Sequence, residues 1–135
     1  MKIRFTGGKR VEAEQTGFVI QTDQPQSNGG ENSAPSPFDL FTASIGTCTG
    51  YYVLAFCQKR GIPTDGIELS LTALRDEERH MVKRVGIEIN LPEDFPEKYV
   101  NACIKSAEQC SVKRHLQEPP EIVLTARRGD EPPAT

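Results

Sequence analysis

The feature that most constrains this chain is a run of nineteen residues without a charge, from Leu40 to Gln58. Its length is close to that of a helix spanning a lipid bilayer. However, the run contains three threonines, a serine, two glycines and a glutamine, and the rest of the chain is hydrophilic. The pattern therefore favours a buried helix over a membrane span. Such a helix must be covered nearly all round, so we expect a partner subunit to supply part of the cover.

Capping signals mark both ends of this helix. Ser36 can cap the first turn, Pro37 suits its first position, and Asp39 stands three residues after the cap in a capping-box position. At the other end, the basic pair at 59–60 suits the negative pole of the helix, and Gly61 can end it. The sequence predicts a helix of about 24 residues, about 36 Å long at 1.5 Å per residue.

Shorter elements flank the long helix on both sides. Alternation of apolar and polar residues predicts strands at 2–6, 10–14, 18–22, 67–73, 85–91 and 121–126. A loop rich in Gly, Pro, Ser and Asn separates the first three strands from the helix. A second helix is predicted to begin near Pro96, with Val100, Cys103, Ala107 and Cys110 on one stripe.

Length and composition favour one soluble domain of the α+β class over residues 1–127, followed by a disordered tail at 128–135. The net charge of −3, with basic residues dispersed among acidic ones, argues against a nucleic-acid partner. The first residues lack the apolar run of a signal peptide, so we expect a cytoplasmic protein.

Four cysteines in a chain of this kind are expected to be reduced thiols rather than a disulfide scaffold. The sequence contains no Cys-x-x-Cys motif, and His80 and His115 lie in charged stretches without the spacing of metal ligands. Both histidines are expected at the surface. We therefore expect neither a metal nor another cofactor.

Cys48 stands in the middle of the long helix, between Gly46 and Gly50. Each glycine costs about 1 kcal/mol relative to alanine in a helix, which suggests that another backbone approaches closely on their shared face. Cys48 points roughly the other way. Its face carries apolar and hydroxyl-bearing side chains: Phe41, Ser44, Ile45, Tyr51, Tyr52 and Ala55. This face suits the wall of an apolar substrate pocket, and it suits the protein core equally well.

Helix geometry limits which cysteines can pair. Cys57 lies about 13 Å along the axis from Cys48 and on the opposite side, and Cys103 and Cys110 are about 10 Å apart. A disulfide needs Cα atoms within about 7 Å, so any functional pair must join the two helices. By spacing alone, Cys48 can meet either Cys103 or Cys110. Each of the four can also be a buried apolar residue of the core.

Three local motifs resemble those of the OsmC/Ohr family, the osmotically inducible and organic hydroperoxide resistance proteins. They are Gly29-Gly30 followed by Ser36-Pro37-Phe38-Asp39-Leu40, then Gly46-Thr47-Cys48 within the helix, and Cys110-Ser111-Val112 about sixty residues later. The order of strands and helices is also similar, and the likeness extends roughly from Ile3 to Ala126.

The resemblance implies an intertwined homodimer in which antiparallel sheets surround the long central helix and the second helix. It also implies a thiol-dependent peroxidase in oxidative-stress defence, without a cofactor. Cys48 matches the peroxidatic cysteine, which becomes a sulfenic acid, and Cys110 matches the resolving cysteine. An external dithiol then reduces the disulfide. Cys57 and Cys103 match no active-site position and keep the core interpretation.

Hydroperoxide-resistance members of this family place an arginine after a glycine pair, held by a glutamate just before the long helix. Arg10 is the nearest candidate for that cation, and Lys9 is the next. Phe38 stands where the glutamate is found, and Asp39 follows it, although a capping role for Asp39 is simpler. These departures place the chain nearer to the less characterised OsmC-like branch.

Two functions follow as hypotheses. The first is reduction of hydroperoxides, organic ones in preference to hydrogen peroxide, with Phe41, Ile45, Tyr51 and Tyr52 lining the substrate pocket. The second is a non-catalytic dimer that binds a small apolar ligand or senses redox state through its cysteines. Turnover with a dithiol distinguishes the two.

Overall fold

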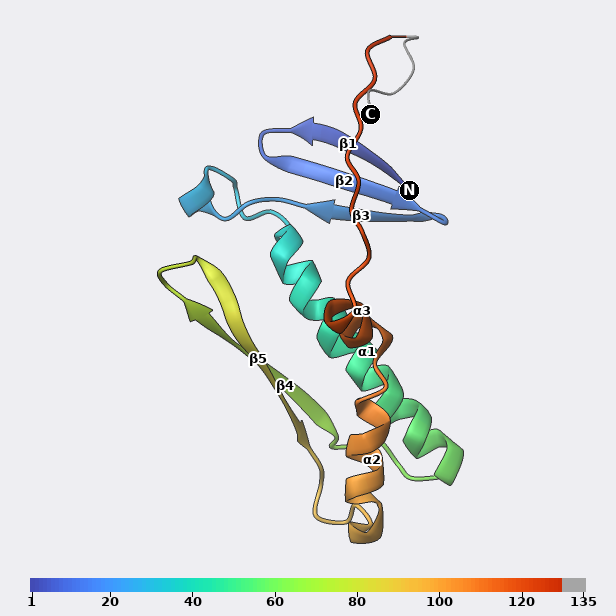
Figure 1. Cartoon of the computed structure of the whole chain (residues 1–135). Coiled ribbons are helices and arrows are strands. Elements are labelled where there is room, and N and C mark those ends of the chain that lie inside the picture. The colour runs from blue at the N-terminus through green and yellow to red at the C-terminus, as the bar shows by residue number, and fades with distance from the viewer. Residues whose placement is uncertain (130–135) are drawn as a thin grey trace.

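The computed structural model describes residues 1–129, and its two sheets and helices form a mixed α+β fold, as expected (Figure 1). In chain order the elements are β1 (Lys2–Gly7), β2 (Arg10–Gln15), β3 (Phe18–Thr22), α1 (Pro37–Arg60), β4 (Glu68–Asp76), β5 (Met81–Asn90), α2 (Val100–Ala107) and α3 (Ser111–Gln117). Two 3-10 turns, η1 (Gln26–Asn28) and η2 (Glu97–Tyr99), precede α1 and α2. Most of the tail expected to be disordered, residues 130–135, lies outside the described residues.

The ends of α1 are those that the capping signals predict. The Ser36 hydroxyl accepts a hydrogen bond from the Asp39 N–H at 3.2 Å, and the Asp39 carboxylate accepts one from the Ser36 N–H at 2.8 Å. This reciprocal pair is a capping box, which satisfies backbone donors that the first turn leaves free. At the other end Gly61 adopts the left-handed conformation with φ 65° and closes the helix.

Both sheets are antiparallel, with strand orders β1–β2–β3 and β4–β5. β4 and β5 are longer than the sequence pattern indicates, because their pairing continues to Asp76 and Met81 at the hairpin tip. In Figure 1 the three-stranded sheet lies across the N-terminal end of α1, and the β4–β5 hairpin runs along one side of the same helix. α1 contacts β4, α2 and α3.

The prediction of a single second helix carrying both Cys103 and Cys110 is wrong. α2 ends at Ala107, and Cys110 leaves the helical region with φ −50° and ψ 117° to become the N-cap of α3. The Ala107 carbonyl accepts hydrogen bonds from the Cys110 N–H at 3.4 Å and from the Lys113 ammonium at 3.0 Å, so the last turn of α2 is closed across the break. Cys110 is fully buried too, but it lies outside the core cluster that contains Cys103 and Ala107.

The prediction of a last strand at 121–126 is also wrong for the single chain. The segment is extended but pairs with no strand among the described residues. Its apolar side chains are open to solvent, with exposed fractions of 83% for Ile122, 70% for Val123 and 93% for Leu124. Strand propensity alone does not form a strand, because the backbone needs the edge of another strand to bond with.

The core lies at the C-terminal half of α1. There Val53, Phe56 and Cys57 pack against Cys103 and Ala107 of α2 and against Phe95, which precedes α2. Ile67, Leu69, Ile89 and Leu91 of the β4–β5 region cover this cluster. The N-terminal half of α1 contributes only Ile45 to the buried set, and Thr49 is buried at the middle of the helix.

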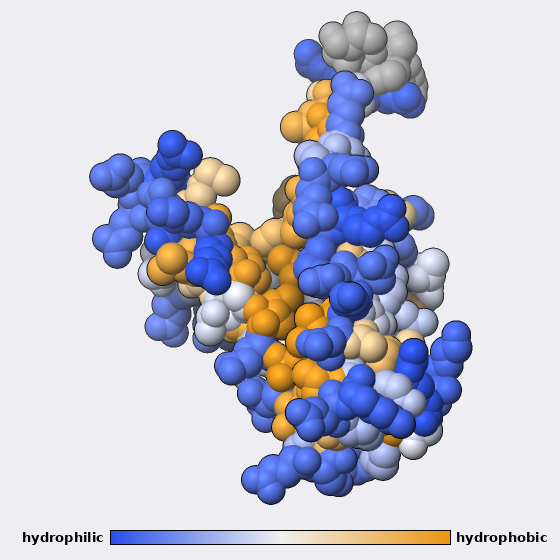
Figure 2. Space-filling view, turned by 60° about the horizontal axis from the view of Figure 1, so that its bottom comes forward, coloured by the Kyte–Doolittle hydropathy of each residue, from blue (hydrophilic) through white to orange (hydrophobic). Residues whose placement is uncertain are grey.

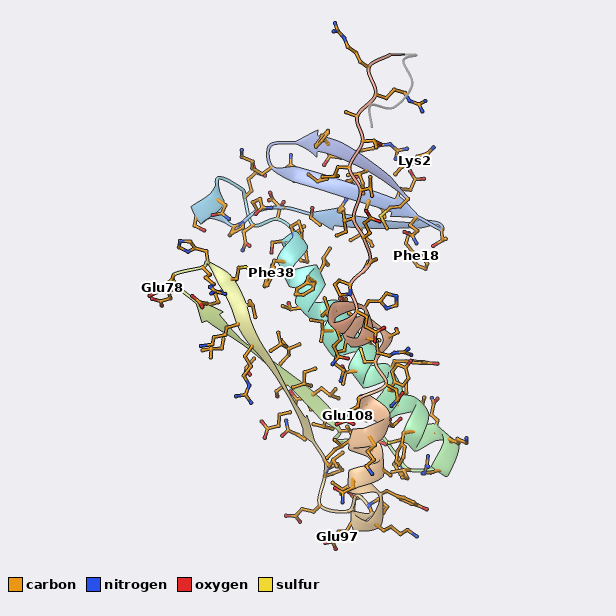
Figure 3. All side chains as sticks on the ribbon, viewed as in Figure 1. Lys2, Phe18, Phe38, Glu78, Glu97 and Glu108 are labelled. Atoms are coloured by element: carbon orange, nitrogen blue, oxygen red, sulfur yellow. The ribbon has the colours of Figure 1, made fainter. Side chains whose placement is uncertain are left out.

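Much of the apolar surface of α1 is uncovered in the single chain, contrary to a helix buried all round. Phe38, Phe41, Tyr51 and Leu54 are all exposed. Apolar side chains gather in a hollow on the face shown in Figure 2, and Phe18 of β3 points away from the rest of the chain in Figure 3. By length and composition α1 could cross a membrane, yet it packs against a sheet and two helices.

Candidate active site at Cys48

Cys48 meets the turn that joins α2 to α3. The Cys48 Sγ lies 3.6 Å from the Oγ of Ser111, which is the first residue of α3. The Cys110 thiol is also within hydrogen-bonding reach of Cys48. Of the two pairings that spacing allowed, the fold therefore brings Cys48 to Cys110 and not to Cys103. Cys48 is half-buried, whereas Cys110 is fully buried.

The surroundings of Cys48 favour its thiolate. Burial by itself would raise the pKa from its ordinary value of 9.0. Hydrogen bonds outweigh that effect: donors are the backbone N–H of Val112, the Cys110 thiol, and the hydroxyl and N–H of Ser111. Together they lower the pKa of Cys48 to about 7, so that a large fraction of the thiol is ionised at neutral pH. No cation is among these groups in the described part of the chain.

Arg10 lies at the start of β2 and pairs with Glu31, its Nη1 being 2.6 Å from the Glu31 Oε2. Glu31 belongs to the loop before α1, and the sequence analysis did not find it as the partner of Arg10. The sequence feature that could have indicated Glu31 is its position directly after Gly30, the second glycine of the family motif. Within this chain, Arg10 is absent from the groups that act on Cys48.

Asp39 serves the helix cap. Its carboxylate accepts hydrogen bonds from the Ser36 hydroxyl at 2.7 Å and from the Ser36 N–H, and these bonds lower the pKa of Asp39. Arg75 acts on it more weakly from a distance. The capping role that the sequence favoured accounts for every hydrogen bond of this side chain among the described residues.

Two of the four predicted pocket residues line one pocket. Phe41 and Ile45 of α1 face a cavity of about 300 Å³ whose other walls come from β5 and α3. Those walls are Val82, Val85, Ile87, Lys113, Leu116 and Gln117, which the sequence analysis did not identify. Tyr51 and Tyr52 lie elsewhere, packed edge to face with ring centroids 5.5 Å apart.

Cys57 and Cys103 belong to the core. Both are fully buried and lie beside one another, and burial raises the pKa of each thiol. A buried thiol with a raised pKa reacts slowly, which agrees with the core interpretation. No group of three or more potential metal ligands occurs in residues 1–129.

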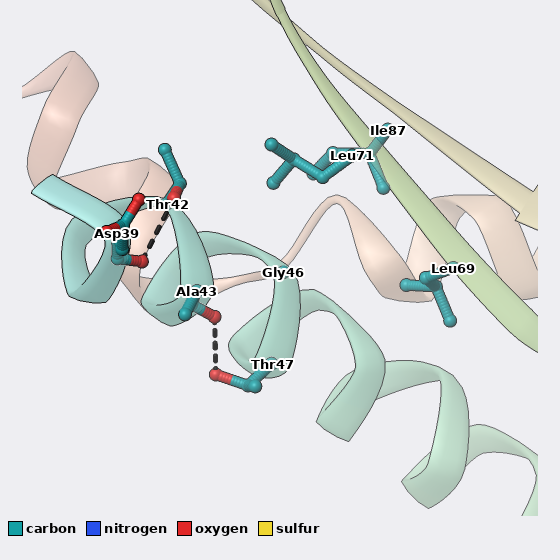
Figure 4. Close-up of a pocket in the computed structure, with 8 residues that line it drawn as sticks. All are labelled: Asp39, Thr42, Ala43, Gly46, Thr47, Leu69, Leu71 and Ile87. Carbon is teal, nitrogen blue, oxygen red and sulfur yellow. Dashed lines mark hydrogen bonds between the residues drawn. The ribbon is translucent and has the colours of Figure 1, made fainter. Parts of the chain in front are cut away.

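A second groove lies between α1 and the β4–β5 hairpin (Figure 4). It has a volume of about 470 Å³, and its floor on α1 is formed by small side chains around Gly46. A Cβ atom added at Gly46 would meet Leu71 at 3.7 Å, and one at Gly50 would meet Leu69 at 4.0 Å, both ordinary contacts. No backbone of the described chain approaches these glycines, so internal packing does not explain them.

Comparison with known proteins gives a family and a fold. A model described as OsmC-like protein matches residues 30–125. A search of curated proteins found no match. Among solved structures, an osmotic stress-induced and detoxification response protein from Psychrobacter arcticus aligns with a TM-score of 0.71 and 24% identity over 84% of each chain.

Two further structures share the fold at lower similarity. An organic hydroperoxide resistance protein OsmC from Legionella pneumophila aligns with a TM-score of 0.52 and 19% identity over 86% of each chain. The organic hydroperoxide resistance protein OhrB of Bacillus subtilis aligns with a TM-score of 0.50 and 18% identity, covering 84% of this chain and 88% of OhrB. The family match spans most of the chain, and the chain therefore belongs to the OsmC-like protein family.

Proposed function

We propose that this protein is a thiol-dependent peroxidase that reduces organic hydroperoxides in defence against oxidative stress. The observation that carries the proposal is a half-buried Cys48 thiol with a pKa of about 7 beside the buried Cys110 thiol. Membership of the OsmC-like family supports it, as do two structural neighbours named as organic hydroperoxide resistance proteins.

The proposed reaction begins at the Cys48 thiolate. Its sulfur attacks the terminal oxygen of the hydroperoxide, so that an S–O bond forms, the O–O bond breaks and the alkoxide leaves with the electron pair. The alkoxide takes up a proton and becomes the alcohol. The Cys110 thiol then attacks the sulfenic acid of Cys48, releasing water and forming a disulfide. An external dithiol reduces this disulfide and returns both thiols to their starting state.

The pocket between α1, β5 and α3 supports an organic substrate, because α1 and α3 also carry Cys48 and Ser111. Phe41, Ile45 and the apolar wall of β5 offer cover to a hydrocarbon group, a contact that hydrogen peroxide cannot make. We expect a higher second-order rate constant with cumene hydroperoxide than with hydrogen peroxide. The reverse order would contradict the preference for organic substrates.

A second copy of this chain is part of the proposal. The uncovered face of α1, the apolar side chains of β1 and β3, and the exposed segment at 121–126 all lack cover in the single chain. So many exposed large apolar side chains are typical of a protein with an interface to another chain. In such a dimer, Arg10 could reach Cys48 from the partner, and its role as a thiolate-supporting residue stays a prediction.

The test is a count of free thiols together with the intact mass after one equivalent of cumene hydroperoxide is added to the reduced protein. We expect rapid loss of two thiols and of two mass units, with Cys57 and Cys103 still reactive after unfolding. Cys48→Ser and Cys110→Ser should each abolish the disulfide. Survival of all four thiols, at rates no faster than free cysteine, would favour instead a non-catalytic dimer that binds an apolar ligand in the same pocket.

A further inference from the structure

The side chain of Ser111 contacts Cys48, and being next to Cys110 in the sequence does not by itself require this contact. Its hydroxyl oxygen is 3.6 Å from the Cys48 sulfur and has no other hydrogen-bond partner among the described residues. Its carbonyl oxygen is engaged elsewhere, 2.7 Å from the Nδ1 of His115. The side chain is exposed, so the hydroxyl lies at the mouth of the site.

We propose that Ser111 is a catalytic residue whose hydroxyl donates a hydrogen bond to the Cys48 thiolate, in a site where no side chain of the same described chain supplies a cation. This inference rests on the proposed peroxidase function. A hydrogen bond to an ionised acceptor is roughly twice as strong as one between neutral groups, so a single hydroxyl can shift a thiol equilibrium appreciably. The lowered pKa of Cys48, to which the Ser111 hydroxyl contributes, agrees with this role.

The other donors near Cys48 cannot play the same part. The Cys110 thiol is itself consumed when the disulfide forms, and the N–H groups of Ser111 and Val112 belong to the backbone. Ser111 is thus the side-chain donor that remains unchanged through the cycle. As the thiolate attacks the hydroperoxide, negative charge moves from sulfur to the departing alkoxide oxygen, and the hydroxyl loses its charged acceptor as the S–O bond forms.

The experiment compares Ser111→Thr with Ser111→Val in the full-length reduced protein. The two side chains have the same shape, and only threonine keeps the hydroxyl. The rate of Cys48 alkylation by iodoacetamide is followed from pH 5 to 10 by mass spectrometry of the Cys48 peptide. Wild type and Ser111→Thr should inflect near pH 7, whereas Ser111→Val and Ser111→Ala should inflect about one unit higher and react about tenfold more slowly at pH 6.

Ser70→Ala serves as the control, because the Ser70 hydroxyl lies on β4 and accepts a hydrogen bond from the Asn90 amide nitrogen at 3.4 Å within the β4–β5 hairpin. Its profile should equal that of the wild type. Identical profiles for Ser111→Thr and Ser111→Val would overturn the inference.

Turnover of cumene hydroperoxide with a dithiol tests the peroxidase function separately from the role of Ser111. A shifted profile in a wild-type protein without turnover would remove the peroxidase function but keep the Ser111 hydrogen bond. Turnover with equal kcat/KM in Ser111→Val would remove the role of Ser111.

Discussion

Asp23 is the buried acid that holds the loop before α1. It is 1% exposed, and its carboxylate accepts hydrogen bonds from the hydroxyl of Ser33 at 2.7 Å and from three backbone N–H groups, those of Gln24, Glu31 and Ser33. These bonds, those from Ser33 above all, lower the pKa of Asp23 to about 2. Gly30 is required in the same loop, because any Cβ there would collide with the Gln24 carbonyl. The loop is thus a fixed structure, and it presents Glu31 to Arg10.

Asp23→Asn should therefore destabilise the protein near neutral pH. Asparagine would turn an N–H₂ group toward donors that now face an oxygen, and we expect the melting temperature to fall by about 5 °C. The folded pKa of Asp23 is below its ordinary value of 3.8, so its stabilising effect is complete above about pH 4 and is lost as the pH falls toward 2. Melting curves of wild type and variant should converge over this range.

Asp65→Asn is the control, since the Asp65 side chain makes no hydrogen bond within residues 1–129. It should melt with the wild type at every pH. A constant difference between wild type and Asp23→Asn down to pH 2 would contradict the assignment of the acid-labile stability to Asp23.

At the scale of elements, the features predicted correctly are those that neighbouring residues determine, such as helix ends and strand positions. Ser36, Asp39 and Gly61 gave both ends of α1, and alternation located the first five strands. The break after α2 was not predictable in this way, because no glycine or proline marks it. The Ala107 carbonyl at the break bonds to Lys113, a residue of the next helix, as well as to the Cys110 N–H. The partners Arg10 and Glu31 are 21 positions apart and meet only through the folded loop.

The last predicted strand, at 121–126, failed for a different reason: it pairs with no strand edge within the described chain. We expect its backbone amides to pair with a second copy. Hydrogen exchange should then show these amides protected at concentrations where the protein is dimeric and exposed on dilution. Val123→Pro removes a donor from the middle of the strand and should abolish the protection, whereas Glu121→Pro, at its first residue, should leave it. Free exchange at every concentration would mean that the segment forms no strand.

At the scale of the whole molecule, the described chain leaves much of its apolar surface uncovered. The well-buried core is confined to one end of α1, while apolar residues remain open along the rest of the helix and on the sheet, with Tyr51 63% and Phe5 88% exposed. From its uncharged run, the sequence predicted that α1 needs cover beyond its own chain, and the partner subunit that would supply it stays a prediction. The sequence could not predict which surfaces remain uncovered, because these depend on how β4, α2 and α3 pack against α1.

Gly46 and Gly50 of α1 can be explained either by packing within the chain or by the close approach of a second copy. Replacing them by alanine distinguishes these explanations, because the first predicts a more stable protein and the second a weaker dimer. Within the chain, Gly46→Ala and Gly50→Ala add methyl groups that fit beside Leu71 and Leu69, and each gains about 1 kcal/mol of helix propensity. If only contacts within the chain determined the effect of the two substitutions, the double variant would be more stable than the wild type. We expect instead that the methyl groups obstruct a second copy in the groove of Figure 4 and weaken the dimer at least tenfold.

Sedimentation velocity over a dilution series measures this effect, with Gln58→Ala as a control at the exposed end of the same helix. The control should dimerise as the wild type does. A double variant with an unchanged dimer and a higher melting temperature would show that no second backbone approaches Gly46 and Gly50. The cover of α1 would then have to come from contacts on its aromatic face, where Tyr51 is exposed.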